Sequence, residues 1–247
     1  MKEDSKAFVA ARRIVGRALG WLLISLAGAG LALWLKSSFA AVALAVAGMW
    51  ILFSAFTLFF FRDPDPCVPT APEAVVAPAH GLVDCVDETT EPEFLGGPCH
   101  RISIFLTVFD VHVQNAPVAG KVAFVKHRPG QFLSALKTES AKCNDNVFIG
   151  IESLEQPGER MAVRQIAGLI ARRIVSWVCA GDTVARGQRL GLIQFGSRCD
   201  LYLPLAAHIR VKPGDRVVGG ETVVATRGSA KHKPNGAGAS SQPLTHP

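Results

Sequence analysis

The sequence predicts an N-terminal transmembrane helical hairpin followed by a mainly β domain, an antiparallel β-sandwich or barrel. Three observations favour this fold class. Two uncharged apolar runs occupy residues 18–35 and 37–61. From residue 74 onward, short β-rich runs are separated by glycine and proline. A turn motif of the form GDxVxxG occurs twice, at residues 181–187 and 214–220.

Residues 1–62 are expected to form a membrane anchor of two hydrophobic helices. A hydrocarbon core of about 30 Å requires about 20 helical residues. The second run is long enough, and the first becomes long enough when Ile14, Val15 and a snorkelling Arg17 are included. Most of the flanking positive charge precedes the first run, on Lys2, Lys6, Arg12, Arg13 and Arg17. By the positive-inside rule, both ends of the hairpin then lie on the cytoplasmic face of the cell (inner) membrane.

Three further segments follow the anchor. Residues 63–73 are rich in proline and are interpreted as an extended linker that separates the next domain from the bilayer. Residues 74–228 are interpreted as a β-rich catalytic domain. Residues 229–247 are polar and rich in Gly, Pro and Ser, which is typical of a disordered tail.

Internal repetition supports a compact β domain. Each GDxVxxG motif is a glycine turn that precedes a β-like run, and such turns recur in lipoyl- and biotinyl-type β hairpins. A looser echo relates residues 77–83 to residues 116–122. Strands are expected at residues 75–76, 82–86, 102–113, 121–125, 148–152, 190–195 and 221–226.

Composition narrows the classes of partner. The formal net charge is +6, which favours an anionic partner, either nucleic acid or an anionic membrane surface. Basic and aromatic residues are not interleaved and there is one Tyr, so no nucleic acid is expected. The six cysteines include no CxxC pair, which gives no indication of a metal cluster and favours free thiols on the cytoplasmic side.

The segment from Ile193 to Pro204 is the most specific for chemistry. A Gly–Ser pair between two apolar β runs is ordinarily a hairpin turn. It also permits self-cleavage, because Gly196 leaves its carbonyl carbon unhindered and the Ser197 hydroxyl can attack it when a base and an oxyanion donor are near. The resulting ester undergoes β-elimination to dehydroalanine, which loses ammonia and becomes an N-terminal pyruvoyl group.

Four segments together resemble the short bacterial form of phosphatidylserine decarboxylase. They are FFFRDPDP at 59–66, APAHG at 77–81, FDVHVQNAPVAG at 109–120 and FGSRCDLYLP at 195–204. The resemblance implies cleavage at Gly196–Ser197 into a β chain (1–196) and an α chain (197–247), which remain together as a heterodimer and can assemble further. It implies a covalent pyruvoyl cofactor made from Ser197, which forms a Schiff base with phosphatidylserine and releases phosphatidylethanolamine and CO2, without a metal.

Three more residues are candidates for catalysis. Asp110 and His112 would share one face of a strand, which suits a carboxylate that orients an acid–base imidazole. The family usually has Asp where this chain has His80, and that Asp belongs to its self-cleavage machinery. His80 could take over as the base for Ser197, or it could be a loop histidine without a role. The family's usual Arg at position 115 is replaced by Asn115.

Two other functions and one assignment stay open at this stage. A membrane hairpin with a lipoyl-like domain could be a non-enzymatic scaffold or adaptor. A decarboxylase could also act on a variant, ether-linked phosphatidylserine. The phosphate of the headgroup needs a cation, for which the candidates are Lys126, His127, Arg128, Arg172, Arg173 and Arg198.

Overall fold

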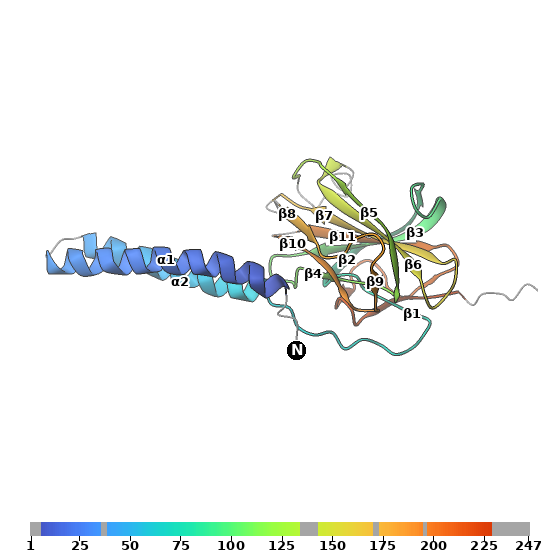
Figure 1. The fold of residues 1–247 in the computed structure, drawn as a ribbon, viewed down its shortest axis with the longest axis horizontal. Coiled ribbons are helices and arrows are strands. Elements are labelled where there is room, and N and C mark those ends of the chain that lie inside the picture. The colour runs from blue at the N-terminus through green and yellow to red at the C-terminus, as the bar shows by residue number, and fades with distance from the viewer. Residues whose placement is uncertain (1–5, 36–38, 134–142, 170–172, 195–196, 229–247) are drawn as a thin grey trace, which may run out of the picture.

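The computed structural model describes residues 6–35, 39–133, 143–169, 173–194 and 197–228. Two long helices, α1 (Lys6–Trp34) and α2 (Phe39–Phe60), form an antiparallel hairpin that projects from one end of a β domain (Figure 1). Within them, Ile14–Trp34 and Phe39–Phe60 are long and apolar enough to cross a membrane, and most of that surface is exposed. The predicted fold class is confirmed.

The β domain is almost entirely antiparallel. Its strands are β1 (Ala74–Val76), β2 (Gly81–Glu91), β3 (Gly97–Leu106), β4 (Val113–Asn115), β5 (Gly120–Arg128), β6 (Asn146–Ser153), β7 (Arg160–Ala167), β8 (Arg173–Ser176), β9 (Thr183–Val184), β10 (Arg189–Gln194), β11 (Ser197–Pro204), β12 (His208–Ile209), β13 (Arg216–Val217) and β14 (Val223–Thr226). A curled sheet has the order β13-β2-β3-β11-β7-β6-β5-β9. Two smaller sheets, β1-β14-β12 and β4-β10-β8, complete the described part of the domain.

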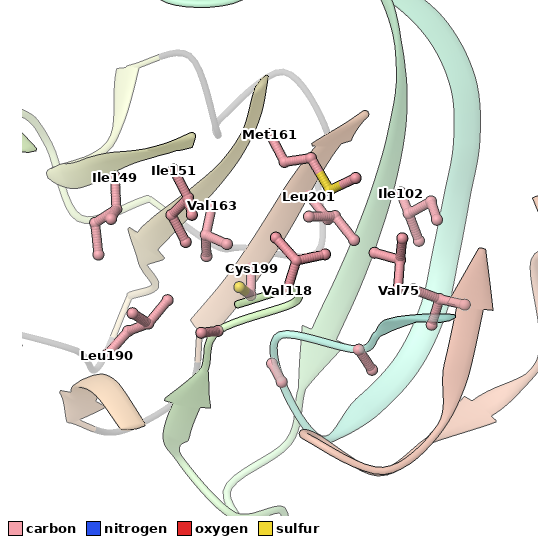
Figure 2. Packing of buried hydrophobic residues seen from close by; sticks show 14 of the residues in the cluster. Val75, Ile102, Val118, Ile149, Ile151, Met161, Val163, Leu190, Cys199 and Leu201 are labelled. Atoms are coloured by element: carbon pink, nitrogen blue, oxygen red, sulfur yellow. The ribbon is translucent and has the colours of Figure 1, made fainter. Parts of the chain in front are cut away.

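The core lies between these sheets. Strands β2, β3, β6, β7 and β11 turn apolar side chains inward, and Figure 2 shows Ile102, Ile149, Val163 and Leu201 among them. Each of these four side chains is fully buried. Burying aliphatic side chains at about 25 cal/mol per Å² is the main favourable term for a domain with no disulfides among its described residues.

The sequence repeat corresponds to a structural repeat. Gly181 and Gly214 both have positive φ, 101° and 96°, which a side chain would strain. The Gly181 N–H donates to the carbonyl of Val122, and the Gly214 N–H donates to the carbonyl of Val83 in the matching position. Residues 77–83 and 116–122 are therefore equivalent segments that lead into β2 and β5, and each accepts a hydrogen bond from one GDxVxxG turn.

Residues 63–73, the predicted linker, lie against the β domain. Arg189 forms ion pairs with Asp63 and Asp65, and the Arg186 guanidinium donates to the carbonyls of Pro69, Ala71 and Pro72. These contacts hold the segment between the hairpin and β1 on the surface of the domain. The tail predicted at 229–247 lies outside the described residues.

The contact between hairpin and domain is apolar. Phe60 and Phe61 at the end of α2 are buried with Val111, Val113 and Leu192 of the domain, and Ala11 of α1 joins the same cluster. The hairpin thus ends on the segment that carries His112. The sequence contained no sign of this contact, because the same aromatic residues suit a helix that ends in a membrane interface.

Candidate functional site

Ser197 begins β11 at one end of the curled sheet. It is paired on one side with Leu106, the last residue of β3, and on the other with Ala167, the last residue of β7. We call this end of the sheet the Ser197 edge. The Ser197 side chain is fully buried, and its Oγ has no hydrogen-bond partner among the described residues. Gly196, its expected partner in cleavage, lies outside the described residues.

His112 reaches the same region from a turn. The prediction of a strand over residues 102–113 is wrong beyond Leu106, because β3 ends there and Thr107–Asp110 form a turn. The Asp110 carboxylate accepts hydrogen bonds from the backbone N–H and the hydroxyl of Thr107, which closes the turn. The carboxylate also pairs with Arg216. Asp110 and His112 therefore do not share a strand face.

Asp110 still orients His112, through its backbone and not through its carboxylate. The Nδ1 of His112 lies 2.9 Å from the carbonyl oxygen of Asp110. A carbonyl can only accept, so Nδ1 carries the proton and Nε2 is the basic nitrogen of the neutral ring. Burial lowers the pKa of His112 from 6.5 to about 4, against the opposing effect of that hydrogen bond. A neutral imidazole with a fixed tautomer is suited to accept a proton at Nε2.

Two contacts enclose His112. The ring of Phe60, from the end of α2, lies 4.2 Å from the imidazole, centroid to centroid. On the domain side, the Gln114 amide donates to the carbonyl of His112, and the Gln165 amide donates to the Oε1 of Gln114. Both glutamines are fully buried. Hydrogen bonds to the backbone carbonyls of Asp110 and His112 thus hold this residue in place, and the ring of Phe60 shields the imidazole from water.

His80 lies at the same edge, directly before β2. The next residues of β2 pair with the end of β3, since Leu82 lies opposite Phe105. Burial lowers the pKa of His80 from 6.5, while the nearby carboxylates of Asp110 and Glu221 raise it. A positive charge on His80 would lower the pKa of His112 further, so the two imidazoles interact electrostatically. The structure therefore brings the neighbourhoods of His80, Asp110, His112 and Ser197 to one end of the sheet.

Most of the basic candidates for the headgroup phosphate pair with carboxylates. Lys126 and Arg128 both pair with Glu93, and His127 pairs with Asp145. Arg198 is 1% exposed and pairs with Asp84. Arg173 is exposed and begins β8 opposite Gln194, three residues before Ser197, and Arg172 lies outside the described residues. Arg62 and Arg216 were not among the predicted candidates, but they contact the turn before His112: Arg62 donates to the carbonyl of Phe109, and Arg216 donates to the carboxylate of Asp110.

Sequence reasoning missed three residues that shape the site. Phe60 was part of an apolar run, and its contact with His112 depends on how the hairpin docks. Asp84 lies in an alternating strand, but its pairing with Arg198 depends on strand register. No sequence pattern indicated that Gln165 would lie at the site. The departure from the family pattern at position 115 was visible in the sequence, and buried Asn115 donates to the carbonyl of Gly187.

Comparison with known proteins identifies relatives of the chain. Residues 53–225 match the family model described as phosphatidylserine decarboxylase. The chain is 46% identical over 176 residues to a phosphatidylserine decarboxylase proenzyme of Desulfotalea psychrophila, covering 71% of this chain and 81% of that protein. It is 44% identical over 201 residues to the phosphatidylserine decarboxylase proenzyme of Nocardia farcinica, covering 80% of this chain and 79% of the relative.

The fold, the site and these matches define the class of protein: a lyase of phospholipid metabolism made as a proenzyme, with an apolar helical hairpin compatible with a membrane. The chain belongs to the phosphatidylserine decarboxylase family. Membership supports the decarboxylase interpretation of the sequence and not the scaffold interpretation.

Proposed function

We propose that this chain converts phosphatidylserine to phosphatidylethanolamine and CO2, after cutting itself between Gly196 and Ser197. The observation that carries the proposal is the buried Ser197 Oγ, without a hydrogen-bond partner among the described residues. It lies at the sheet edge to which the His80 and His112 segments also lead. A buried hydroxyl without a hydrogen-bond partner among the described residues suits a nucleophile better than a structural role.

The cleavage is proposed as a serinolysis. The Ser197 oxygen attacks the carbonyl carbon of Gly196, the peptide C–N bond breaks, and Ser197 keeps a free amino group. Elimination of the ester then returns the carboxylate of Gly196 to the β chain and leaves dehydroalanine on the α chain. Addition of water and loss of ammonia convert that residue to a pyruvoyl group. The two chains, 1–196 and 197–247, stay together because β11 remains paired between β3 and β7.

The surroundings of Ser197 fit a pyruvoyl group. The new chain end would be held by its strand neighbours and by the buried Arg198, which pairs with Asp84. When present, the group supplies an electron sink for the loss of CO2. The residues of the chain have the other tasks: they bind the headgroup, exclude water and move protons.

Two histidines are proposed to divide the proton transfers. His80, neutral at pH 7 because burial lowers its pKa, accepts the proton of the Ser197 hydroxyl during cleavage. The His112 Nε2 is the unprotonated nitrogen of a ring oriented by the bond from Nδ1 to Asp110, and it serves the decarboxylation step. A transient proton on His112 is held weakly, since its pKa is about 4, and is therefore given up readily to carbon.

The decarboxylase is proposed to act at the cytoplasmic face of the cell's inner membrane. The basis is the excess of Lys and Arg before the first apolar helix and the apolar hairpin itself. A reporter enzyme fused after Arg62 should be active only in the cytoplasm. Activity in the periplasm would reject this orientation.

The direct test of the reaction uses the full chain in vesicles that contain phosphatidylserine. The expected result is stoichiometric phosphatidylethanolamine and CO2 from the wild type and neither from Ser197→Ala. Turnover by the Ser197→Ala variant, or none by a fully processed wild type, would reject the proposed function.

A further inference from the structure

Three chain segments leave the curled sheet beside Ser197. Strands β3 and β7 both run antiparallel to β11, so both end at the Ser197 edge, after Leu106 and Ala167. Strand β6 begins at the same edge, because Asn146 lies opposite Ile166 of β7. The residues just beyond these strand ends therefore form the outer surface of the Ser197 edge.

These residues include four exposed apolar side chains. Phe109 follows β3 and is 65% exposed, and Leu169 follows β7 and is also 65% exposed. Phe132 and Leu133, 39% and 42% exposed, precede β6. Asn144 fixes their position at this edge, since its amide donates to the carbonyls of both Leu133 and Ala167. Large apolar groups that gather at loop tips are typical of surfaces that meet another apolar phase.

The apolar hairpin meets the domain at this same edge. The Arg62 guanidinium, just beyond α2, donates to the carbonyl of Phe109 at 2.5 Å. The ring of Phe60 contacts the ring of His112, and His112 follows Phe109 by three residues in the chain. In Figure 1 the hairpin leaves the domain from the end where β4, β8 and β10 lie. The exposed apolar surface of the two helices thus ends beside Phe109, one of the four loop tips at the Ser197 edge.

Basic side chains border the same surface. Arg216 has a side chain that is 67% exposed, and its strand β13 pairs with the start of β2, opposite Leu82. Arg62 lies beside Phe109. Apolar tips bordered by cations are suited to a bilayer interface with anionic headgroups.

We propose that the Ser197 edge is itself an interfacial membrane surface. Phe109, Leu169, Phe132 and Leu133 insert among the lipid headgroups, while the hairpin spans the bilayer. The catalytic edge then lies at the depth of the headgroup, so that a lipid reaches His112 and Ser197 without leaving the membrane. The account of lipid delivery rests on the proposed function, whereas the insertion of the loop tips does not.

Photo-crosslinking tests the insertion independently of catalysis. Benzoylphenylalanine is placed singly at Phe109 or Leu169 of the full chain, in vesicles of phosphatidylcholine and phosphatidylglycerol. Matched controls are Leu154 and Leu205, which are 61% and 46% exposed and lie near the opposite end of the sheet. Lipid adducts are expected at 109 and 169 and not at 154 and 205. Equal lipid labelling at both ends, no lipid adduct at 109 and 169, or protein–protein adducts there in place of lipid would overturn the proposal.

A second measurement separates lipid delivery from chemistry. Leu169→Ser should lower turnover of phosphatidylserine in vesicles by roughly tenfold, because an apolar anchor at the interface is lost. Turnover of a short-chain phosphatidylserine dissolved as monomers should stay unchanged, and Leu154→Ser should change neither. An equal loss on both substrates would reject delivery through this edge. If the wild type converts neither substrate, the proposed function fails, while the crosslinking result still decides whether the edge inserts.

Discussion

The ring of Phe60, the last residue of α2, lies 4.2 Å from the ring of His112, and both side chains are fully buried. The membrane-type anchor thus forms part of the wall around the candidate acid–base residue. Burial is the largest cause of the low pKa of His112, about 4. The hairpin therefore contributes to the burial that lowers the pKa of His112.

Removing the Phe60 ring should hydrate His112. In the Phe60→Ala variant we expect the pKa of His112 to rise from about 4 toward 6.5. The measurement is a pH titration of the imidazole resonances, with His112→Gln used for assignment. Leu52→Ala, at an exposed position of the same helix, should leave the pKa near 4. An unchanged pKa in Phe60→Ala would show that the β domain alone excludes water from His112, which would contradict a role for the hairpin.

The same shift makes stability depend on pH. The native pKa of His112 lies below its unfolded value, so the unfolded chain binds more protons between pH 6.5 and pH 4. His112 should therefore reduce stability as the pH falls through this window and have no such effect above pH 6.5. In His112→Gln, the loss of stability between pH 6.5 and 4 should be smaller than in the parent chain.

Replacing the two histidines should separate maturation from turnover. His80→Ala is expected to accumulate uncut precursor, because it removes the proposed base for the Ser197 hydroxyl. His112→Ala should still process but lose turnover by at least about a hundredfold, the usual contribution of an acid–base group. Gel analysis and product formation measure the two effects. Normal maturation of His80→Ala refutes the first half, and near-normal turnover by processed His112→Ala refutes the second.

The ion pair between Asp84 and Arg198, the residue after Ser197, should contribute to stability. Asp84 pairs with Arg198, whose side chain is 1% exposed, so Asp84→Ala would leave a buried guanidinium without this carboxylate. Because the Asp84 side chain is 25% exposed, the expected loss is about 3 kcal/mol, the lower end for breaking a buried pair. Denaturant unfolding in the Ser197→Ala background measures it. Glu88→Ala, on the same strand with a side chain 70% exposed, should cost less than about 0.5 kcal/mol. Equal effects of the two changes would contradict this role for the pair.

Local patterns were enough to predict the hairpin, the β domain and the two glycine turns. Uncharged runs, β-rich segments and turn glycines each depend on neighbouring residues, which a sequence displays directly. The turn at Thr107–Asp110 was missed because the segment before it is continuously β-like, and the turn is closed by one carboxylate. Contacts between distant segments, such as Phe60 with His112 and Asp84 with Arg198, depend on docking and strand register, which no local pattern encodes. The residue pattern and the resemblance together predicted Ser197 and His112 as candidates, whereas their surroundings depend on the fold.

Intact mass of the purified protein tests the central claim most directly. The wild type should give two chains, 1–196 and 197–247, and the smaller should be lighter than a simple hydrolysis product by one ammonia, with no free amino terminus. Ser197→Ala should give one chain near 26.3 kDa. A wild type that stays as one chain, a smaller chain that begins with an unmodified serine, or a Ser197→Ala variant that still splits at this bond would contradict the account.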